Sequence, residues 1–306
     1  MRRPSPTLSF LASIALTCAG VAGLFAEPPR FIGAREANAQ TPVHQRIVAA
    51  GGVITEIIYA LGMQDQIVGV DTTSLFPANA MKDKPNVGYV RALSAEGVLS
   101  LKPSLVIAID GAGPPDALKL VTDAGVNVAH VPDEFTADGV VDRVRRVAAI
   151  VGAGPRGETL AASTAEGFRA LDVAKARIAT PKRVLFILSL QNGKVMAAGR
   201  NTSADAIMKL AGATNVFNAF DGYKPVTDEA ITAAAPDFIL AMDRAGQTFS
   251  ADQIFALPSF ATTPAAKTKS FAAMDGLYLL GFGPRTPDAA RDLMQAIYGA
   301  AVAGRS

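Results

Sequence analysis

The feature that most constrains the fold is an internal repeat with one copy in each half of the chain. Residues Ser94–Gly113, SAEGVLSLKPSLVIAIDGAG, align without a gap with Thr227–Gly246, TDEAITAAAPDFILAMDRAG, at an offset of 133 positions. Each copy starts with a hydroxyl residue that can cap a helix, runs through about two helical turns to a proline, and continues as an apolar strand followed by aspartate. A repeated helix–strand unit in corresponding places predicts two similar lobes.

Strands and helices alternate around both copies of the repeat. Short apolar strands such as RIVAAG at Arg46–Gly51 are followed by helices that end at glycine, which is the pattern of a parallel α/β sheet. Residues 136–180 between the two copies have a helical pattern interrupted by GAGPRGE. We therefore expect an α/β fold of two Rossmann-like lobes, at 40–135 and 181–306, joined by a long helical linker at 136–180. Lobes of this kind bind ligands in the crevice between them, at the carboxyl ends of their strands.

The N-terminus has the pattern of an export signal. Two arginines precede an uncharged run that reaches Ala26, and the small residues Ala37 and Ala39 frame a cleavage site. We expect residues 1–39 to be removed as a signal peptide and the mature protein to lie in the periplasm. An uncleaved membrane anchor is the alternative, and a lipoprotein attached through Cys18 is a further one.

Removal of this signal leaves a chain with balanced charge and no cysteine. Cleavage takes away four basic and two acidic side chains, so 25 of each remain from the totals of 29 and 27. This balance does not indicate a basic surface for nucleic acid, so we expect no nucleic-acid binding. We also expect a monomer. Cys18 is the only cysteine of the chain, so the mature protein can form neither a disulfide nor a thiolate metal site.

The sequence favours binding over catalysis. It contains no nucleophile elbow, no P-loop and no dinucleotide-binding glycine fingerprint, so we do not expect an enzyme. His44 and His130 are its only histidines, and His130 is more typical of a residue at the core or rim than of a ligand. Binding proteins for zinc or manganese need several histidines and carboxylates around the metal, which this chain does not provide.

Four stretches resemble one known family over nearly the whole mature chain. They are RIVAAGGVITEIIYALGMQDQIVGVDTTSLFP, VGYVRALSAEGVLSLKPSLVIA, DGYKPVTDEAITAAAPDFIL and MDGLYLLGFGPRTP, which are similar to the haem-binding periplasmic proteins of bacterial haem ABC importers. That family belongs with the helix-linked, class III binding proteins for cobalamin and iron-siderophores. The resemblance implies a protein that carries haem b as transported ligand to the permease dimer of an importer. An iron-siderophore or cobalamin carrier of the same fold is the alternative.

Tyr89 is the candidate iron ligand, and the resemblance places the haem-binding tyrosine at this position. A phenolate is a hard, anionic oxygen donor that suits Fe(III), and tyrosinate is a known axial ligand of haem. Residue chemistry alone leaves an alternative, in which Tyr89 is a half-buried tyrosine packed on the rim of the lobe. Arg91, two residues further on, would neutralise a haem propionate or face solvent.

The second repeat carries the other candidate pocket residues. Arg244 replaces Gly111 of the first repeat, so we expect it on the opposite wall of the cleft. There it would stabilise the phenolate or pair with a propionate, as the resemblance implies; a solvated loop arginine is the alternative. Tyr223 and Lys224 precede Thr227 much as Tyr89 precedes Ser94, which predicts a place at the mouth of the cleft.

Two glutamates occupy matching positions of the repeat. Glu96 and Glu229 lie two residues after the predicted helix caps, where an acid interacts favourably with the helix dipole. The resemblance gives them a second role, because related proteins dock on their two-subunit permease through one exposed glutamate on each lobe. The sequence has no tryptophan and five tyrosines, so haem would depend on apolar walls such as Leu75, Phe76 and Leu280.

Overall fold

The computed structural model describes residues 45–191, 193–244 and 248–304. The predicted signal peptide at 1–39, Cys18 and His44 lie outside these residues. Within the described ranges, no helix is both long enough and apolar enough to cross a membrane.

The N-terminal lobe is built on a four-stranded sheet. Its strands follow the order β2-β1-β5-β6, and every pair is parallel, as the strand–helix alternation predicts. The strands are β1 (Ile47–Ala50), β2 (Ile67–Val70), β5 (Leu105–Ile109) and β6 (Asn127–Val131). The helices are α1 (Gly52–Ala60), the short η1 (Gln64–Gln66), α2 (Ala80–Asp83), α3 (Ala95–Ser100) and α4 (Pro115–Asp123).

The two central strands, β1 and β5, are buried on both faces, which explains why they are apolar throughout. Ile47 and Ala49 of β1 belong to the core beneath α1, whereas Val48 and Ala50 belong to the core on the opposite face, with residues of α3 and α4. Successive side chains of a strand point to opposite faces, so a strand covered on both sides has no polar alternation.

The C-terminal lobe contains a six-stranded, mixed sheet. Its main order is β10-β8-β7-β11-β12, and β9 pairs with β7. The strands are β7 (Arg183–Gln191), β8 (Lys194–Ala198), β9 (Thr214–Asn215), β10 (Tyr223–Val226), β11 (Phe238–Asp243) and β12 (Phe271–Asp275). Because β8 runs antiparallel to both β7 and β10, this lobe departs from the all-parallel sheet of the first one.

Eight helices are described in the C-terminal lobe, and most are short. They are α7 (Ser203–Leu210), α8 (Asp228–Ala234), α9 (Ala251–Phe255), α10 (Pro258–Ala261), α11 (Pro264–Thr268), α12 (Gly276–Leu280), α13 (Thr286–Tyr298) and α14 (Ala300–Ala303). Helix α13 carries much of the core on its inner face, where Leu293 and Met294 are completely buried.

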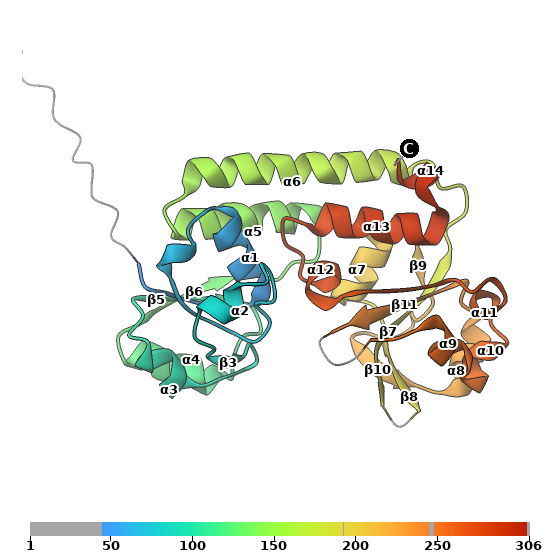
Figure 1. Cartoon of the computed structure of the whole chain (residues 1–306), viewed down its shortest axis with the longest axis horizontal. Coiled ribbons are helices and arrows are strands. Elements are labelled where there is room, and N and C mark those ends of the chain that lie inside the picture. The colour runs from blue at the N-terminus through green and yellow to red at the C-terminus, as the bar shows by residue number, and fades with distance from the viewer. Residues whose placement is uncertain (1–44, 192, 245–247, 305–306) are drawn as a thin grey trace, which may run out of the picture. The chain divides into compact units, whose positions relative to one another are not determined.

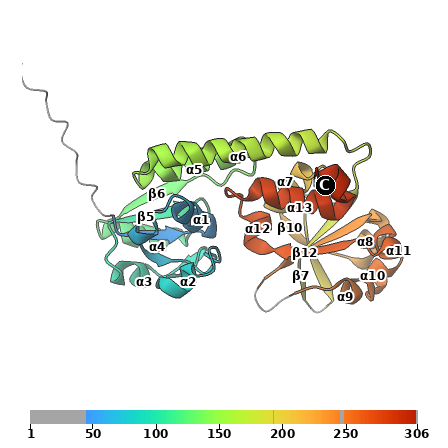
Figure 2. The ribbon, with the colours of Figure 1, turned by 45° about the horizontal axis from the view of Figure 1, so that its top comes forward.

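Two packed helices link the lobes. Helix α5 (Ala137–Ile150) and the 22-residue helix α6 (Gly154–Lys175) lie side by side, and α13 packs against α6 as well (Figures 1 and 2). Gly157 permits the close approach of α5 and α6, since a Cβ atom there would come within 2.2 Å of the Ala148 Cβ. The break predicted at GAGPRGE lies between the two helices, and Pro155 occupies the first turn of α6.

The internal repeat is confirmed in the backbone and in the helix caps. The Ser94 hydroxyl accepts a hydrogen bond from the Gly97 N–H at 3.0 Å, and the Thr227 hydroxyl accepts one from the Ala230 N–H at 3.2 Å. The residue before the proline of each copy is left-handed, with φ of 47° at Lys102 and 40° at Ala235. Non-glycine residues rarely adopt this conformation, so its occurrence at matching positions supports a common structural unit.

Candidate ligand-binding cleft

Tyr89 lies on a small hairpin between the strands β2 and β5 of the N-terminal sheet. The hairpin pairs β3 (Gly88–Tyr89) with β4 (Ala92–Leu93), and it is held by backbone bonds from Gly113 N–H to the Val90 carbonyl at 2.9 Å and from Leu93 N–H to the Gly113 carbonyl at 2.7 Å. Gly88 adopts φ of 103°, a conformation that side chains disfavour. Val90 is buried in the lobe, whereas Tyr89 is 49% exposed, so the fold presents this ring on a fixed support.

Within the described part of the chain, three of the other four tyrosines have a hydrogen-bonded hydroxyl, whereas Tyr89 does not. Burial raises the pKa values of Tyr59, Tyr278 and Tyr298 and thereby disfavours their phenolates. Hydrogen bonds engage the hydroxyls of Tyr223 with Ser203 at 3.2 Å, of Tyr278 with Asp292 at 2.9 Å, and of Tyr298 with the Gly212 carbonyl at 2.7 Å. Among the described residues, none forms a hydrogen bond with the Tyr89 hydroxyl, which leaves this oxygen available to a ligand.

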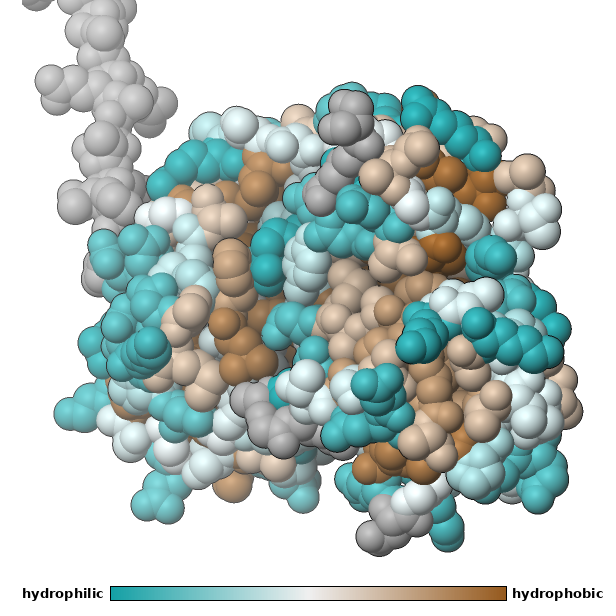
Figure 3. All heavy atoms as spheres, turned by 45° about the vertical axis from the view of Figure 1, so that its right-hand side comes forward, coloured by the Kyte–Doolittle hydropathy of each residue, from teal (hydrophilic) through white to brown (hydrophobic). Residues whose placement is uncertain are grey.

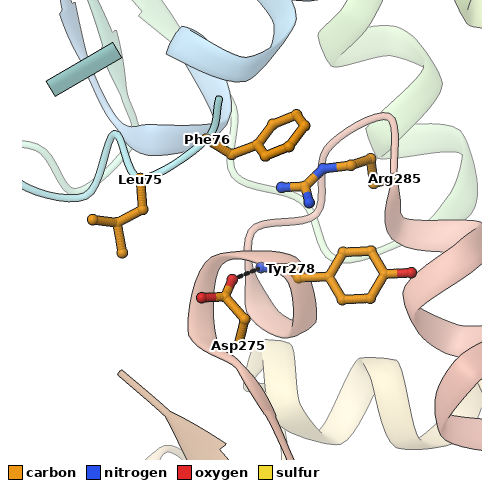
Figure 4. A pocket seen from close by; sticks show the side chains of 5 residues that line it. All are labelled: Leu75, Phe76, Asp275, Tyr278 and Arg285. Atoms are coloured by element: carbon orange, nitrogen blue, oxygen red, sulfur yellow. Dashed lines mark hydrogen bonds between the residues drawn. The ribbon is translucent and has the colours of Figure 1, made fainter. Parts of the chain in front are cut away.

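A pocket of about 310 Å³ lies between residues of the two lobes (Figure 4). Leu75 and Phe76 come from the loop after β2, Asp275 and Tyr278 from the start of α12, and Arg285 from the start of α13. Ligand pockets usually measure about 300–1,000 Å³, so this space suits one part of a larger ligand.

A buried carboxylate fixes the loop that carries Leu75 and Phe76. Asp71 is completely buried and accepts hydrogen bonds from the Gly51 N–H at 2.8 Å, from the N–H and the hydroxyl of Thr73 at 2.8 and 2.6 Å, and from the Ser74 hydroxyl at 3.2 Å. The loop nevertheless leaves Leu75 44% and Phe76 41% exposed. Apolar side chains held in water by a rigid loop are typical of a ligand-contacting wall.

Exposed apolar residues also gather near this end of the N-terminal lobe. Three of the five large hydrophobic side chains that are most exposed among the described residues, Leu75, Phe76 and Tyr89, lie in the loops after β2 or in the following hairpin. The other two lie on helices. Figure 3 shows one face of the molecule, on which apolar residues gather toward the middle and hydrophilic side chains surround them.

Arg285 stacks between two aromatic rings, and its charge is already paired. Its guanidinium lies 3.6 Å from the centre of the Phe76 ring and 5.1 Å from that of Tyr278. Its Nε and Nη2 donate to the Glu56 carboxylate at 3.0 and 2.8 Å, a bidentate arrangement. Glu56 neutralises this arginine and Asp275 adds a negative charge, so the pocket favours a flat apolar group over an anion.

Arg91 and Arg244, the two arginines predicted for the cleft, are both exposed. Arg91 occupies the turn of the Tyr89 hairpin. Burial raises the pKa of Asp133, two residues after β6, whereas the charges of Arg143 and Arg91 act in the opposite direction. Arg244 directly follows β11. Neither contributes to the 310 Å³ pocket.

Tyr223 and Lys224 lie on β10, the edge strand of the C-terminal sheet. The Tyr223 ring packs near Phe186, with ring centres 6.4 Å apart, and the Lys224 ammonium lies 5.4 Å from the Phe220 ring centre. Both residues therefore have partners in their own lobe, and neither lines the 310 Å³ pocket. Leu280 packs with the core of the C-terminal lobe. His130 is exposed on the edge strand β6.

The two matched glutamates are exposed in the first turns of α3 and α8. Hydrogen bonds from its own backbone N–H and from Thr227 lower the pKa of Glu229, so this carboxyl is ionised at neutral pH. A hollow of about 450 Å³ adjoins it, lined by Asp228, Glu229, Thr232, Ala233, Pro258 and Ser259. The internal repeat did not predict this hollow beside Glu229.

Sequence reasoning did not assign Glu56, Asp275, Tyr278 or Arg285, although three of them lie in the stretch MDGLYLLGFGPRTP. A usable signal existed for the fourth, because Glu56 is the one charged residue of the apolar helix α1. Across the residues that the structure describes, no group of three or more His, Cys, Asp or Glu side chains could hold a metal ion.

Comparisons with known proteins agree with this architecture. A solved periplasmic haem-binding protein of Roseiflexus sp. RS-1 is 41% identical, with a TM-score of 0.78, and the match covers 84% of this chain and 99% of that one. The haem-binding protein BhuT, solved with two haems, is 38% identical, with a TM-score of 0.79 and coverage of 84% and 99%.

More distant relatives carry other descriptions. An uncharacterized ABC transporter substrate-binding lipoprotein of Bacillus subtilis is 27% identical over 83% of this chain and 80% of its own length. A vitamin B12-binding protein of Vibrio campbellii is 26% identical over 71% and 76%, respectively. The family model described as periplasmic binding protein matches residues 47–277. The chain therefore belongs to the periplasmic binding protein family, in the form whose two α/β lobes are joined by a helical linker.

Proposed function

We propose that this protein captures haem in the cleft between its lobes and delivers it to the permease of an ABC importer. The observation that carries the proposal is the half-exposed Tyr89, whose hydroxyl has no hydrogen-bonding partner among the described residues, on a fixed hairpin. An oxygen donor in this state can bind ferric iron without first breaking a bond within the protein. The two solved relatives that are 41% and 38% identical bind haem, which supports the same ligand here.

Tyr89 does not line the 310 Å³ pocket, and we assign the remaining parts of a haem to the residues that do. Phe76, Leu75 and the Arg285–Tyr278 stack offer a flat, largely apolar surface to one part of the macrocycle. The exposed cations Arg91 and Arg244 supply charge for the phenolate and the propionates. We also assign Tyr223 and Lys224 to the mouth of the cleft, although neither lines the 310 Å³ pocket.

The proposal is tested by adding hemin to the mature protein and recording the absorption spectrum. We expect a saturable change in the haem bands at one defined stoichiometry, and a competition experiment with cyanocobalamin or a ferric siderophore should leave the haem bound. Saturable binding of cyanocobalamin, with no spectral response to hemin, would overturn haem in favour of the vitamin B12 carriers among the relatives.

Delivery of haem requires a docking surface, and we assign it to Glu96 and Glu229. Both side chains are exposed, both occupy the first turn of a helix, and they are related by the internal repeat, so the protein can present one carboxylate from each lobe to two similar subunits. The hollow beside Glu229 gives space for a long basic side chain of the permease. We infer that residues 1–39 export the chain to the periplasm, where it would meet such a permease.

The double substitution Glu96→Arg and Glu229→Arg is expected to abolish haem transport while leaving haem binding in solution unchanged. Close charge pairs across interfaces contribute about 1.5–7 kcal/mol, so two reversals should lower permease affinity by more than about tenfold. Stimulation of ATP hydrolysis by the reconstituted importer measures this effect. Glu166→Arg, at an exposed acid of α6, is the control. Full stimulation by the double variant would remove these glutamates from the interface.

A further inference from the structure

We propose that Phe282–Arg285, here named the clamp segment, fixes the separation of the two lobes, and that Glu56 and Arg285 are positioning residues for the cleft. The segment belongs to the C-terminal lobe, yet its contacts reach α1, the loop after β2 and the start of the linker. This proposal rests on the proposed function only in the measurements that add hemin, and the distances between the lobes without ligand are independent of it.

The first attachment of the clamp segment is to the linker. The Arg143 side chain, on α5, is fully buried, and its Nη1 donates to the Phe282 carbonyl at 2.6 Å. The Phe282 ring packs edge-to-face on Phe135, which precedes α5, with centres 5.2 Å apart. Phe282 itself is 1% exposed and adopts φ of 50°, so its backbone is held in a conformation that favours glycine.

The second attachment is a close approach to α1. A Cβ atom on Gly283 would lie 3.0 Å from the Val53 Cγ2 and 3.1 Å from the Glu56 Oε1. A Cβ on Gly52 would lie 3.0 Å from the Leu277 Cδ1 of α12, but its tightest contact, at 2.1 Å, would be with the Thr73 carbonyl oxygen of its own lobe. The glycine at position 283 therefore lets α1 and the C-terminal lobe meet without an intervening side chain.

The third attachment is the ion pair between Glu56 and Arg285. The Glu56 side chain is 5% exposed and that of Arg285 is 28% exposed, so water screens this pair far less than it screens a surface pair. The guanidinium also fills the space between Phe76 of one lobe and Tyr278 of the other. Removal of either charge would leave a partly buried ion without its partner.

These three attachments set the spacing of the two pocket walls before any ligand arrives. Phe76 and Tyr278 are held on opposite sides of one guanidinium, so a change in lobe separation would break the stack and the ion pair together. Haem therefore enters a cleft of nearly fixed width. A protein that visited the competent width for only a tenth of the time would bind about tenfold more weakly.

The spacing of the lobes can be measured directly with spin labels on the mature chain, which contains no native cysteine if cleavage occurs at the expected site. Leu120→Cys on α4 and Lys267→Cys on α11 place labels on exposed positions of the two lobes. We expect a narrow distance distribution by pulsed electron spin resonance that does not shift when hemin is added. In the same background, Arg285→Lys should broaden it, because lysine keeps the charge but loses the bidentate bond and the stacking.

Arg145→Lys is the matched control, since it makes the same change at the exposed ion pair with Glu158. The control should keep the narrow distribution and the haem affinity, whereas Arg285→Lys should weaken haem binding by about tenfold. If circular dichroism shows that Arg285→Lys does not fold, Glu56→Gln replaces it with the same expectation. A distribution unchanged in the folded variant, or a wild-type distance that shifts with hemin, would overturn the clamp. The distances measured without ligand test the clamp even if the wild-type protein binds no hemin. Failure of haem binding would therefore overturn the proposed function and leave the clamp testable.

Discussion

Replacement of Tyr89 by phenylalanine is expected to lower haem affinity by more than about 100-fold and to remove the spectral signature of a phenolate ligand. The substitution keeps the ring on its hairpin and deletes only the oxygen, so loss of binding would report iron ligation. Loss of an outer-shell partner of a metal site costs roughly 10–100-fold, and loss of the ligand itself should exceed that. Titration with hemin, followed by absorption spectroscopy, measures both effects.

Tyr298→Phe serves as the control for this prediction, because Tyr298 does not line the pocket. Burial raises the pKa of Tyr298, and its hydroxyl is bonded to the Gly212 carbonyl and the Lys182 N–H, so its phenol is a poor anionic ligand. We expect Tyr298→Phe to keep the wild-type spectrum. If Tyr89→Phe bound hemin with the wild-type affinity and spectrum, Tyr89 would not be the ligand, and another donor would have to be sought.

Arg143→Met is expected to lower the free energy of unfolding by about 3–5 kcal/mol, the usual result of removing one partner from a buried, charged network. The Arg143 side chain is fully buried, donates to the Pro132, Glu134 and Phe282 carbonyls, and pairs with Asp133 at 2.9 Å. Methionine would fill similar space without satisfying any of these acceptors. Urea denaturation followed by circular dichroism measures the difference.

Arg145, two residues further along the same helix, supplies a control. Arg145→Met removes an arginine whose side chain is 46% exposed and whose acidic partners are exposed as well. Surface ion pairs contribute about 0–1 kcal/mol, so this variant should remain close to wild type. Equal stability of the two variants would show that the buried network contributes little to folding.

Local patterns were enough to predict the framework of the fold. The repeat gave two lobes, the caps at Ser94 and Thr227 are present, and the helical break falls within GAGPRGE. These features depend on residues a few positions apart, where cap chemistry and apolar periodicity act directly. The antiparallel strand β8 was not predicted, because its apolar residues resemble those of a parallel strand.

The contacts around the cleft could not be predicted in the same way. Glu56 and Arg285 are 229 positions apart, and nothing near either residue indicates its partner. The analogy between Tyr89 and Tyr223 is also inexact, since Tyr89 lies five residues before its helix cap and Tyr223 lies four before its own. A shift of one residue in a strand turns a side chain to the other face, and Tyr223 packs in its own lobe.

The linker pair α5–α6 and the clamp segment affect how empty and loaded protein compete for the permease. If the lobes keep one separation, the outer surface that carries Glu96 and Glu229 is the same in the empty and the loaded protein. The permease would then meet both forms with similar affinity, and empty protein would occupy it as a competitor. Transport would depend on the fraction of binding protein that is loaded, so overproduction of the protein at scarce haem would slow uptake instead of raising it.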